Sequence, residues 1–341
     1  MSKASQGVAV LGGGSFGTAL AAVLADNGHA VHLWLRDPEV AEAINTRNEN
    51  PHYFPGRKLP DGIHATTELL ACVEAAETVF VSVPSKAFRS VVKAAVTAAR
   101  PGQYWVSTAK GVEPEGFHLM SAILEEELPE DPCGVLSGPN LASEMLDRCL
   151  TATVIASPHE GLRKRVQTLM GNSYFRVYAN TDTYGVELAG ALKNIYAIVS
   201  GLAAALKMGE NTRAMLMTRS LAEMSRFAVS MGANPMTFMG LAGVGDLIVT
   251  CSSSKSRNYR VGYQLGQGRT LDDIVSHLGQ VAEGVETLKT VHFKALEMGV
   301  DMPLVTALYK IVYEQSPIED VIRSLMSRQQ SSDVEFILPR E

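Results

Sequence analysis

Short runs of apolar residues alternate with helical segments along the first half of the chain. The runs occupy residues 7–11, 30–35, 78–83, 104–108, 135–137, 151–156 and 174–178. Several are apolar throughout rather than at every second position, which is typical of parallel strands covered on both faces. Strands that alternate with helices in this way predict a doubly wound α/β domain, which we place at residues 1–181.

The hydrophobic period changes near residue 182, where strand signals fade. Leu188, Leu192 and Val199 recur at the spacing of one helix face. We therefore expect an all-helical domain over residues 182–341. From residue 327 onward the chain is polar and mixed, and we expect it to be loosely held.

The longest apolar stretch, residues 186–206, contains Glu187, Lys193 and Asn194. Charges near the middle of a membrane are costly, so we expect a buried helix of a large protein rather than a membrane span. The residues before the first apolar run are too few and too polar for a signal peptide.

The first apolar run leads directly into the glycine pattern G-x-G-x-x-G. Gly12 permits a tight turn, Gly14 lets the backbone approach a pyrophosphate, and Gly17 lets the following helix pack against its strand. The N–H groups and dipole at the helix start then hold the phosphates. A structural turn without a ligand is the simpler alternative. The order strand, turn, helix, strand favours a Rossmann-type dinucleotide site.

Polar clusters follow three of the expected strands. They are Ser82-Val83-Pro84-Ser85, Thr108-Ala109-Lys110-Gly111 and Ser137-Gly138-Pro139-Asn140. Turns after strands are usually polar, so one such cluster would mean little. Because ligands of doubly wound sheets bind outside the carboxyl ends of the strands, three clusters together indicate a binding edge.

The end of the second expected strand bears on the choice of nucleotide. If this strand ends at Leu35, Arg36 stands where it suits a 2′-phosphate, which favours NADP. If the strand runs further, Asp37 reaches the ribose diol and favours NAD, although Asp37-Pro38 also reads as a turn or a helix start. We expect NADP to be preferred, with use of NAD as well.

The composition and net charge of the chain argue against some classes of protein but do not identify its function. A net charge of −6 argues against a general nucleic-acid or membrane-surface binder, and its simplest meaning is solubility. The four cysteines are far apart, with no C-x-x-C pair. This spacing offers no metal site and fits a reduced compartment, so we expect a cytoplasmic protein without a bound metal.

Lys193 is the most suggestive side chain outside the glycine turn. It lies in a segment whose helical faces are nearly all apolar. A partly desolvated lysine has a lowered pKa and can serve as acid and base. A lysine that extends to the surface along its helix is the alternative. The adjacent Asn194 either fixes a substrate hydroxyl or caps a turn.

A second candidate cluster follows in residues 243–258. Arg257 can hold a phosphate with its planar fork, and Thr250, Ser256 and Asn258 can add neutral donors. Asp246 can orient a lysine ammonium or accept a proton from a hydroxyl. A solvated basic turn and a helix cap are the simpler interpretations of these residues.

Together these motifs make the chain closely resemble the bacterial-type NAD(P)-dependent glycerol-3-phosphate dehydrogenases. The resemblance covers nearly the whole chain. Its motifs are G-G-G-S-F-G-T-A-L (12–20), N-G-H-x-V-x-L-W (27–34), V-P-S (83–85), A-K-G (109–111), S-G-P (137–139), F-R-V-Y (175–178), G-V-E-L-x-G-A-L-K-N (185–194), T-R-x-L-A-E-M-x-R (218–226), F-M-G-L-A-G-V-G-D-L (238–247), S-R-N (256–258) and G-Q-V-x-E-G (279–284).

The resemblance implies an oxidoreductase that reversibly reduces dihydroxyacetone phosphate to sn-glycerol 3-phosphate for phospholipid synthesis. It implies that Lys193 is the proton acceptor during oxidation. The implied substrate contacts are Lys110, Gly138, Lys193, Asp246, Ser256, Arg257 and Asn258. The implied cofactor contacts are Ser15, Phe16, Arg36, Lys110, Ala142, Arg257, Val281 and Glu283. We also expect the nicotinamide near Pro84 and Lys110, with the ketone between it and Lys193.

One position departs from the family's pattern. Asn140 stands where these enzymes usually have serine or threonine after S-G-P. An amide can still donate to the substrate, but with a different geometry. The resemblance further implies a helical C-terminal domain of the 6-phosphogluconate dehydrogenase-like kind and assembly as a homodimer.

Two rival functions remain open to the sequence. A 3-hydroxyacid or 6-phosphogluconate-type dehydrogenase shares both domains and a lysine-asparagine pair, but gives no reason for Asp246 and Ser256-Arg257-Asn258 at this spacing. A non-enzymatic sensor of NAD(P) needs no catalytic lysine beside a phosphate site.

Overall fold

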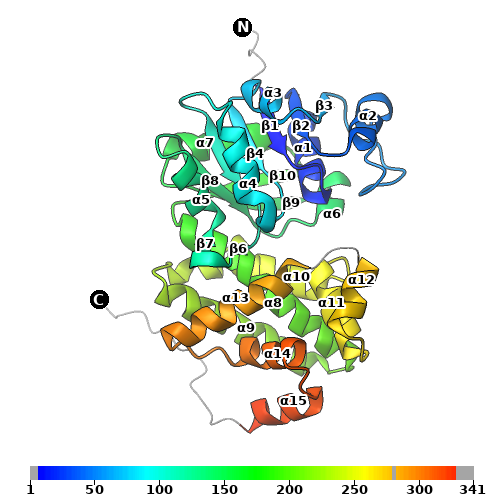
Figure 1. The fold of residues 1–341 in the computed structure, drawn as a ribbon, viewed down its shortest axis with the longest axis vertical. Helices are drawn as coiled ribbons and strands as arrows, with labels where there is room; N and C mark the ends of the chain where they lie inside the picture. Colours follow the sequence, from blue (N-terminus) through cyan, green and yellow to red (C-terminus); the bar gives the residue numbers. More distant parts are fainter. Residues whose placement is uncertain (1–6, 279–281, 328–341) are drawn as a thin grey trace. The chain divides into compact units, whose positions relative to one another are not determined.

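The computed structural model describes residues 7–278 and 282–327, and these residues form two compact units divided between Glu187 and Leu188 (Figure 1). The first unit is built on a mostly parallel sheet and the second on helices. The helix α8 (Thr183–Ala205) begins in the first unit and continues into the second.

The first unit contains an eight-stranded sheet in the order β10-β9-β8-β5-β4-β1-β2-β3. Its strands are β1 (Val8–Leu11), β2 (Val31–Trp34), β3 (Ile63–Thr66), β4 (Thr78–Val81), β5 (Tyr104–Ser107), β8 (Cys133–Ser137), β9 (Thr151–Ala156) and β10 (Phe175–Asn180). Consecutive pairs from β3 across to β8 are parallel. The doubly wound α/β architecture expected from the hydrophobic pattern is therefore confirmed.

Two features of the sheet depart from the sequence-based prediction. First, β9 pairs antiparallel with β8, and β10 runs parallel to β9. Apolar content shows that a strand is buried but not which way it runs. Second, the sequence analysis did not predict β3, because only alternate residues of this short edge strand are buried and it therefore has no continuous apolar run. The sequence analysis also did not predict a two-stranded antiparallel hairpin, which consists of β6 (Val112–Glu113) and β7 (His118–Leu119).

Helices cover both faces of the sheet. One apolar core joins β1 and β2 to α1 (Ser15–Asp26), α2 (Pro38–Arg47) and α7 (Glu160–Met170), and α6 (Ala142–Leu146) packs against α1. The other core joins the opposite side of the same strands to α3 (Leu69–Glu74), α4 (Ser85–Val96) and α5 (Met120–Glu127). Strands with both faces buried explain the continuous apolar runs in the sequence.

The second unit is helical throughout its described residues, as the hydrophobic period predicted. After α8 come α9 (Glu210–Ser230), the short turns Pro235–Met239 and Leu241–Gly245, α10 (Asp246–Ser252), α11 (Arg257–Gly266), α12 (Leu271–Leu278), α13 (Glu283–Met298), α14 (Pro303–Tyr313) and α15 (Ile318–Met326). The helix α8 is long and apolar enough to cross a membrane, but 83% of its most apolar window is buried inside the protein. This burial fits the core helix of a soluble protein.

Two glycines allow α8 and α11 to approach closely. A Cβ atom on Gly201 of α8 would lie 1.9 Å from the carbonyl oxygen of Tyr259, and one on Gly262 of α11 would lie 1.8 Å from that of Ile198. Because no side chain fits at either position, the two backbones are in direct contact. This contact fixes the middle of α11 against the C-terminal half of α8.

A buried carboxylate joins the first turn of α5 to the start of α8. The Glu187 carboxylate accepts hydrogen bonds from the backbone N–H of Ser121, at 3.1 and 3.3 Å, and from the Ser121 hydroxyl. Burial raises the pKa of Glu187 from 4.5 to about 7. The folded protein therefore holds a proton here over a pH range in which the unfolded chain has released it.

We expect Glu187→Gln to flatten the dependence of stability on pH. A carboxyl group with a raised pKa contributes stability that is complete below 4.5 and is lost as the pH rises through about 7. The amide stays neutral, so the variant should lose less thermal stability than the wild type across this range. The measurement is the unfolding midpoint at several pH values. Glu223→Gln is the matched companion because burial raises the pKa of Glu223 to about 7 as well. Identical slopes in wild type and variants would contradict the assignment.

Candidate active site

The glycine turn between β1 and α1 has the geometry of a phosphate cradle. Gly12 has φ +126°, and a Cβ there would lie 2.5 Å from the Ser82 carbonyl oxygen. A Cβ on Gly17 would lie 1.9 Å from the Gly12 oxygen, so the helix must pack against the turn without a side chain. Gly14, by contrast, faces open space. It is the N-cap residue of α1 and no side chain caps the helix start, which leaves this end suited to an anion.

These three glycines predict different outcomes for alanine substitutions. Gly14→Ala fits the fold, because its φ of −70° suits alanine and its Cβ meets no atom within 4 Å. The methyl group fills the space that the pyrophosphate needs, so nucleotide affinity should fall about tenfold or more while the unfolding midpoint stays near wild type. Gly17→Ala should instead lower the midpoint itself, because its Cβ collides with backbone.

Titration calorimetry with NADPH and thermal unfolding of both variants separate the two effects. Unchanged nucleotide affinity in Gly14→Ala would show that the phosphates bind elsewhere.

A buried asparagine supports the glycine turn, and the sequence analysis missed it. Asn50 donates from its amide to the Gly13 carbonyl oxygen at 3.1 Å and to the Thr18 hydroxyl at 2.9 Å. The side chain is fully buried. Asn50 lies far along the chain in a polar loop with no helical or strand period, so no sequence signal connects it to residues 12–17.

Lys110 and Gly138 follow two neighbouring strands and meet at the same edge of the sheet. The Lys110 amine donates to the Gly138 carbonyl oxygen at 3.2 Å. The strands β5 and β8 that carry them are parallel, so their carboxyl ends lie together. Ser82 joins this edge from β4, with its hydroxyl 2.6 Å from that of Thr108. The three polar clusters singled out in the sequence thus follow neighbouring parallel strands and lie at one edge of the sheet.

Asn140 is held by β9. Its amide nitrogen donates to the Ala152 carbonyl oxygen at 3.0 Å, and its oxygen accepts from the Thr153 hydroxyl at 2.8 Å. Both ends of the amide are therefore engaged within the protein. This arrangement supports a role in holding the loop after β8, and a contact of Asn140 with substrate stays a prediction.

The residues after β2 occupy distinct environments. Arg36 is exposed and follows the buried Leu35. The Asp37 carboxylate caps α2, accepting from the backbone N–H groups of Glu39 at 2.9 Å and Val40 at 3.3 Å. Asp37 therefore starts a helix, as the Asp37-Pro38 pair indicated. Which of Arg36 and Asp37 meets the nucleotide stays a prediction.

Of the remaining expected cofactor contacts in the first unit, Ser15 and Phe16 open α1, Ala142 opens α6 and Pro84 precedes α4. Phe16 and Ala142 pack against the same apolar core.

Lys193 lies inside the second unit, and its polar partners include Asp246 and Thr250. Its ammonium donates to the Asp246 carboxylate and, at 2.9 Å, to the Thr250 hydroxyl. The side chains of Lys193 and Asp246 are 6% and 1% exposed, so this lysine does not extend to the surface along its helix. The Thr250 hydroxyl also lies 2.6 Å from the Asp246 carbonyl oxygen. A buried ammonium paired in this way keeps a fixed position and has a proton to give.

A π-helical turn presents Asp246 to the lysine. The turn spans Leu241–Gly245 and leads directly into α10. A Cβ on Gly243 would lie 2.2 Å from the Phe238 carbonyl oxygen, so this glycine is required for the turn. Single π turns are frequent at functional sites.

The residues at the start of α11 gather beside α8 and α13. The Asn258 amide oxygen accepts from the Gly284 N–H at 3.0 Å, and the space that a Cβ on Gly284 would fill is bounded by Asn258 and the Asn194 carbonyl oxygen. The Ser256 hydroxyl caps α11 by accepting from the Tyr259 N–H at 3.3 Å. Arg257, the first residue of α11, is exposed.

The structure thus brings Lys193 together with Asp246 and Thr250, and Asn194 together with Asn258. Glu283, an expected cofactor contact, opens α13 next to Gly284 and is half-buried. Val281 lies outside the described residues. Within residues 7–278 and 282–327, no group of three or more histidine, cysteine or acidic side chains is arranged to hold a metal ion.

Comparison with known proteins gives one consistent family. A family model described as NAD-dependent glycerol-3-phosphate dehydrogenase N-terminus matches residues 7–163, and the corresponding C-terminus model matches residues 182–323. A curated glycerol-3-phosphate dehydrogenase [NAD(P)+] of Azotobacter vinelandii is 57% identical over 334 residues, which cover 98% of each chain.

Solved structures agree with this match. The crystal structure of glycerol-3-phosphate dehydrogenase from Coxiella burnetii has a TM-score of 0.90 at 35% identity, covering 95% of this chain and 99% of that one. The glycerol-3-phosphate dehydrogenase of Saccharomyces cerevisiae has a TM-score of 0.83 at 30% identity, covering 95% and 100%.

Proposed function

The chain belongs to the family of NAD-dependent glycerol-3-phosphate dehydrogenases, and from this premise we propose that Lys193 is its catalytic acid and base. The protein is an NAD(P)-dependent oxidoreductase that acts on the CH–OH group of glycerol 3-phosphate. The observation that carries the role of Lys193 is its buried ammonium, held between the Asp246 carboxylate and the Thr250 hydroxyl.

During reduction, the carbonyl oxygen of dihydroxyacetone phosphate gains negative charge as the hydride reaches C2. The Lys193 ammonium stabilises this charge and donates the proton that completes the alcohol. During oxidation the neutral amine accepts the proton from the C2 hydroxyl. Asp246 orients the ammonium and offsets the cost of burying its charge.

The substrate phosphate binds to the start of α11. The Arg257 guanidinium supplies two parallel donors, and Ser256 and Asn258 add neutral ones. Lys110 and Gly138 contribute from the edge of the sheet, with Asn194 near the hydroxyls. Binding energy from the phosphate, which does not react, fixes the orientation of the ketone.

The residues of the first unit fit a dinucleotide. The space beside Gly14 and the uncapped start of α1 suit the pyrophosphate, and Arg36 suits a 2′-phosphate. When bound, the reduced nicotinamide supplies the hydride for C2 of the ketone. The chain uses NAD or NADP. We propose that NADP is preferred, because Arg36 is exposed after β2 whereas Asp37 is engaged as a helix cap.

The family assignment argues against the two rival functions, a 3-hydroxyacid or 6-phosphogluconate-type dehydrogenase and a non-enzymatic NAD(P) sensor. We further propose a cytoplasmic homodimer that supplies sn-glycerol 3-phosphate to phospholipid synthesis. That Lys193 faces the reactive carbon of the nicotinamide near Pro84 and Lys110 stays a prediction.

The test is loss of NADPH or NADH absorbance with three substrates. Dihydroxyacetone phosphate should be reduced, with a lower KM for NADPH than for NADH. Unphosphorylated dihydroxyacetone should react poorly, because it cannot engage Arg257, and glyceraldehyde 3-phosphate should react poorly because its carbonyl is at C1. Cofactor binding without turnover of dihydroxyacetone phosphate would contradict the function.

A further inference from the structure

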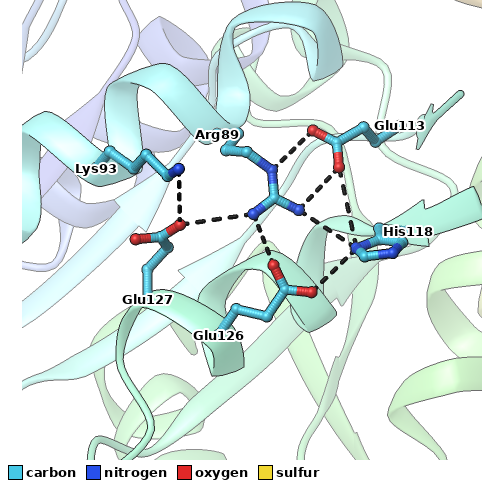
Figure 2. A network of polar contacts seen from close by, with 6 residues as sticks. All are labelled: Arg89, Lys93, Glu113, His118, Glu126 and Glu127. Carbon is cyan, nitrogen blue, oxygen red and sulfur yellow. Dashed lines mark hydrogen bonds and ion pairs between the residues drawn. The ribbon is translucent and has the colours of Figure 1, made fainter. Parts of the chain in front are cut away.

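Arg89 of α4 lies at the centre of a polar network in the first unit, together with Lys93, Glu113, His118, Glu126 and Glu127 (Figure 2). The guanidinium donates to both oxygens of Glu113, each at 2.8 Å, so the two side chains form a two-pronged pair. Its remaining nitrogen donates to Glu126 at 2.6 Å and reaches Glu127 at 3.5 Å. Glu113 lies in β6, whereas Glu126 and Glu127 lie at the end of α5. Arg89 therefore joins three elements.

The opposite strand of the hairpin enters the same network. His118 of β7 is the cross-strand partner of Glu113 and lies 3.0 Å from Glu126. The Arg89 guanidinium lowers the pKa of Glu113 and of Glu126, mainly through the hydrogen bonds that it donates to them. Both carboxylates are thus held in the charged form, which strengthens their bonds to the arginine.

This hairpin begins two residues after Lys110. The intervening Gly111 lies against the first residue of α4, because a Cβ on it would be 2.4 Å from the Ser85 hydroxyl oxygen. Helix α4 therefore fixes the segment that follows Lys110 at two points. Ser85 contacts Gly111 at the helix start, and one turn later Arg89 forms an ion pair with Glu113.

The segment before Lys110 is anchored in the sheet. The Thr108 N–H donates to the Val81 carbonyl oxygen at 3.0 Å, and its hydroxyl lies 2.6 Å from that of Ser82. Lys110 is thus the half-buried residue of a short loop whose two sides are each fixed by different contacts. Among the contacts described here, the Arg89–Glu113 pair, which holds the segment after Lys110, is the one between charged side chains. A single substitution of Arg89 therefore releases this segment while the segment before Lys110 stays anchored in the sheet.

We propose that Arg89 is a positioning residue, which holds hairpin β6–β7 against α4 and so presents the Lys110 amine to the substrate. This inference rests on the proposed function for the role of Lys110. The planar fork matters as much as the charge, since it binds both Glu113 oxygens and Glu126 at once. Lysine has no such fork, so it cannot replace Arg89.

The experiment is a double-mutant cycle with Lys110→Ala, read as kcat/KM for dihydroxyacetone phosphate at saturating NADPH. We expect Arg89→Ala and Arg89→Lys each to lower kcat/KM about tenfold when Lys110 is present. We expect neither to lower it further when Lys110 is already alanine, because Arg89 acts through that amine. Glu127→Gln is the matched control. It removes the negative charge from the 3.5 Å contact with Arg89 and from the 3.6 Å pair with Lys93 while leaving the Glu113 pair intact, so it should stay near wild type.

Amide hydrogen exchange supplies a readout that needs no turnover. Arg89→Ala should exchange faster in residues 109–119, while β4 and β5 keep their protection. An equal loss of kcat/KM in both Lys110 backgrounds, or unchanged exchange in this segment, would overturn the inference. If Arg89→Ala exchanges faster in this segment but the wild type does not reduce dihydroxyacetone phosphate, the result contradicts the proposed function and not the packing role of Arg89.

Discussion

Replacing Lys193 with methionine is expected to lower kcat for dihydroxyacetone phosphate by about a thousandfold. Methionine keeps the length and apolar stem of the side chain but has no proton to give and no charge for the developing oxyanion. The glycine turn Gly12–Gly17, which we expect to hold the pyrophosphate, belongs to the first unit, whereas Lys193 belongs to the second. We therefore expect the affinity for NADPH to stay within about twofold of wild type.

Steady-state reduction and titration calorimetry with NADPH measure the two quantities separately. Lys310→Met is the matched control, because Lys310 is an exposed lysine on another helix of the same unit. The loss of charge beside Asp246 will lower stability, so activity is compared below the unfolding midpoint of the variant. Turnover near wild type in Lys193→Met would end the case for this residue as the catalyst.

Arg257→Ala is expected to raise the KM for dihydroxyacetone phosphate about a hundredfold, with a smaller change in kcat. A two-pronged guanidinium–phosphate contact contributes two charge-assisted hydrogen bonds, each worth about 1.5–3 kcal/mol in favourable cases, and part of that is recovered by water. Arg257→Lys should fall between wild type and alanine, because it keeps the charge and loses the fork. Activity toward unphosphorylated dihydroxyacetone should change little in either variant.

Arg260→Ala is the control for this series, since Arg260 is an exposed arginine one turn further along α11. NADPH is kept saturating, because Arg257 is also an expected nucleotide contact. A uniform loss of activity on the phosphorylated and unphosphorylated substrates would contradict a phosphate-binding role for Arg257.

The fold was largely predictable because its signals are local. The glycine pattern at Gly12, Gly14 and Gly17 needs only a preceding strand and a following helix, and both are encoded within the same short segment. The reversal at β9 was not predictable, because a buried strand is apolar in either direction and its direction is set by the path of the chain around it. Strand β3 was missed because an edge strand needs burial on alternate residues only.

The residue types of the candidate site were predictable from the sequence, but the contacts between their side chains were less so. A lysine within an apolar helix and an aspartate after a glycine-rich turn were visible as candidates, and the structure pairs Lys193 with Asp246. A contact of Thr250 with the substrate stays a prediction. The Thr250 hydroxyl contacts Lys193 and the Asp246 carbonyl oxygen, which the sequence did not indicate. Only the packing of α10 against α8 reveals this.

The sequence by itself determined where most strands of the large sheet, the change to a helical unit and the glycine turn lie, because periodicity and turn chemistry act over a few neighbouring residues. The tertiary structure decided which distant side chains meet: Asn50 with the Gly13 carbonyl, Asn140 with β9, and Arg89 with three carboxylates from two other elements. A period assigns a residue to the buried or exposed face of its element, but it does not specify which element packs against that face. Contacts between residues far apart in the chain therefore depend on the whole fold, and no local pattern encodes them.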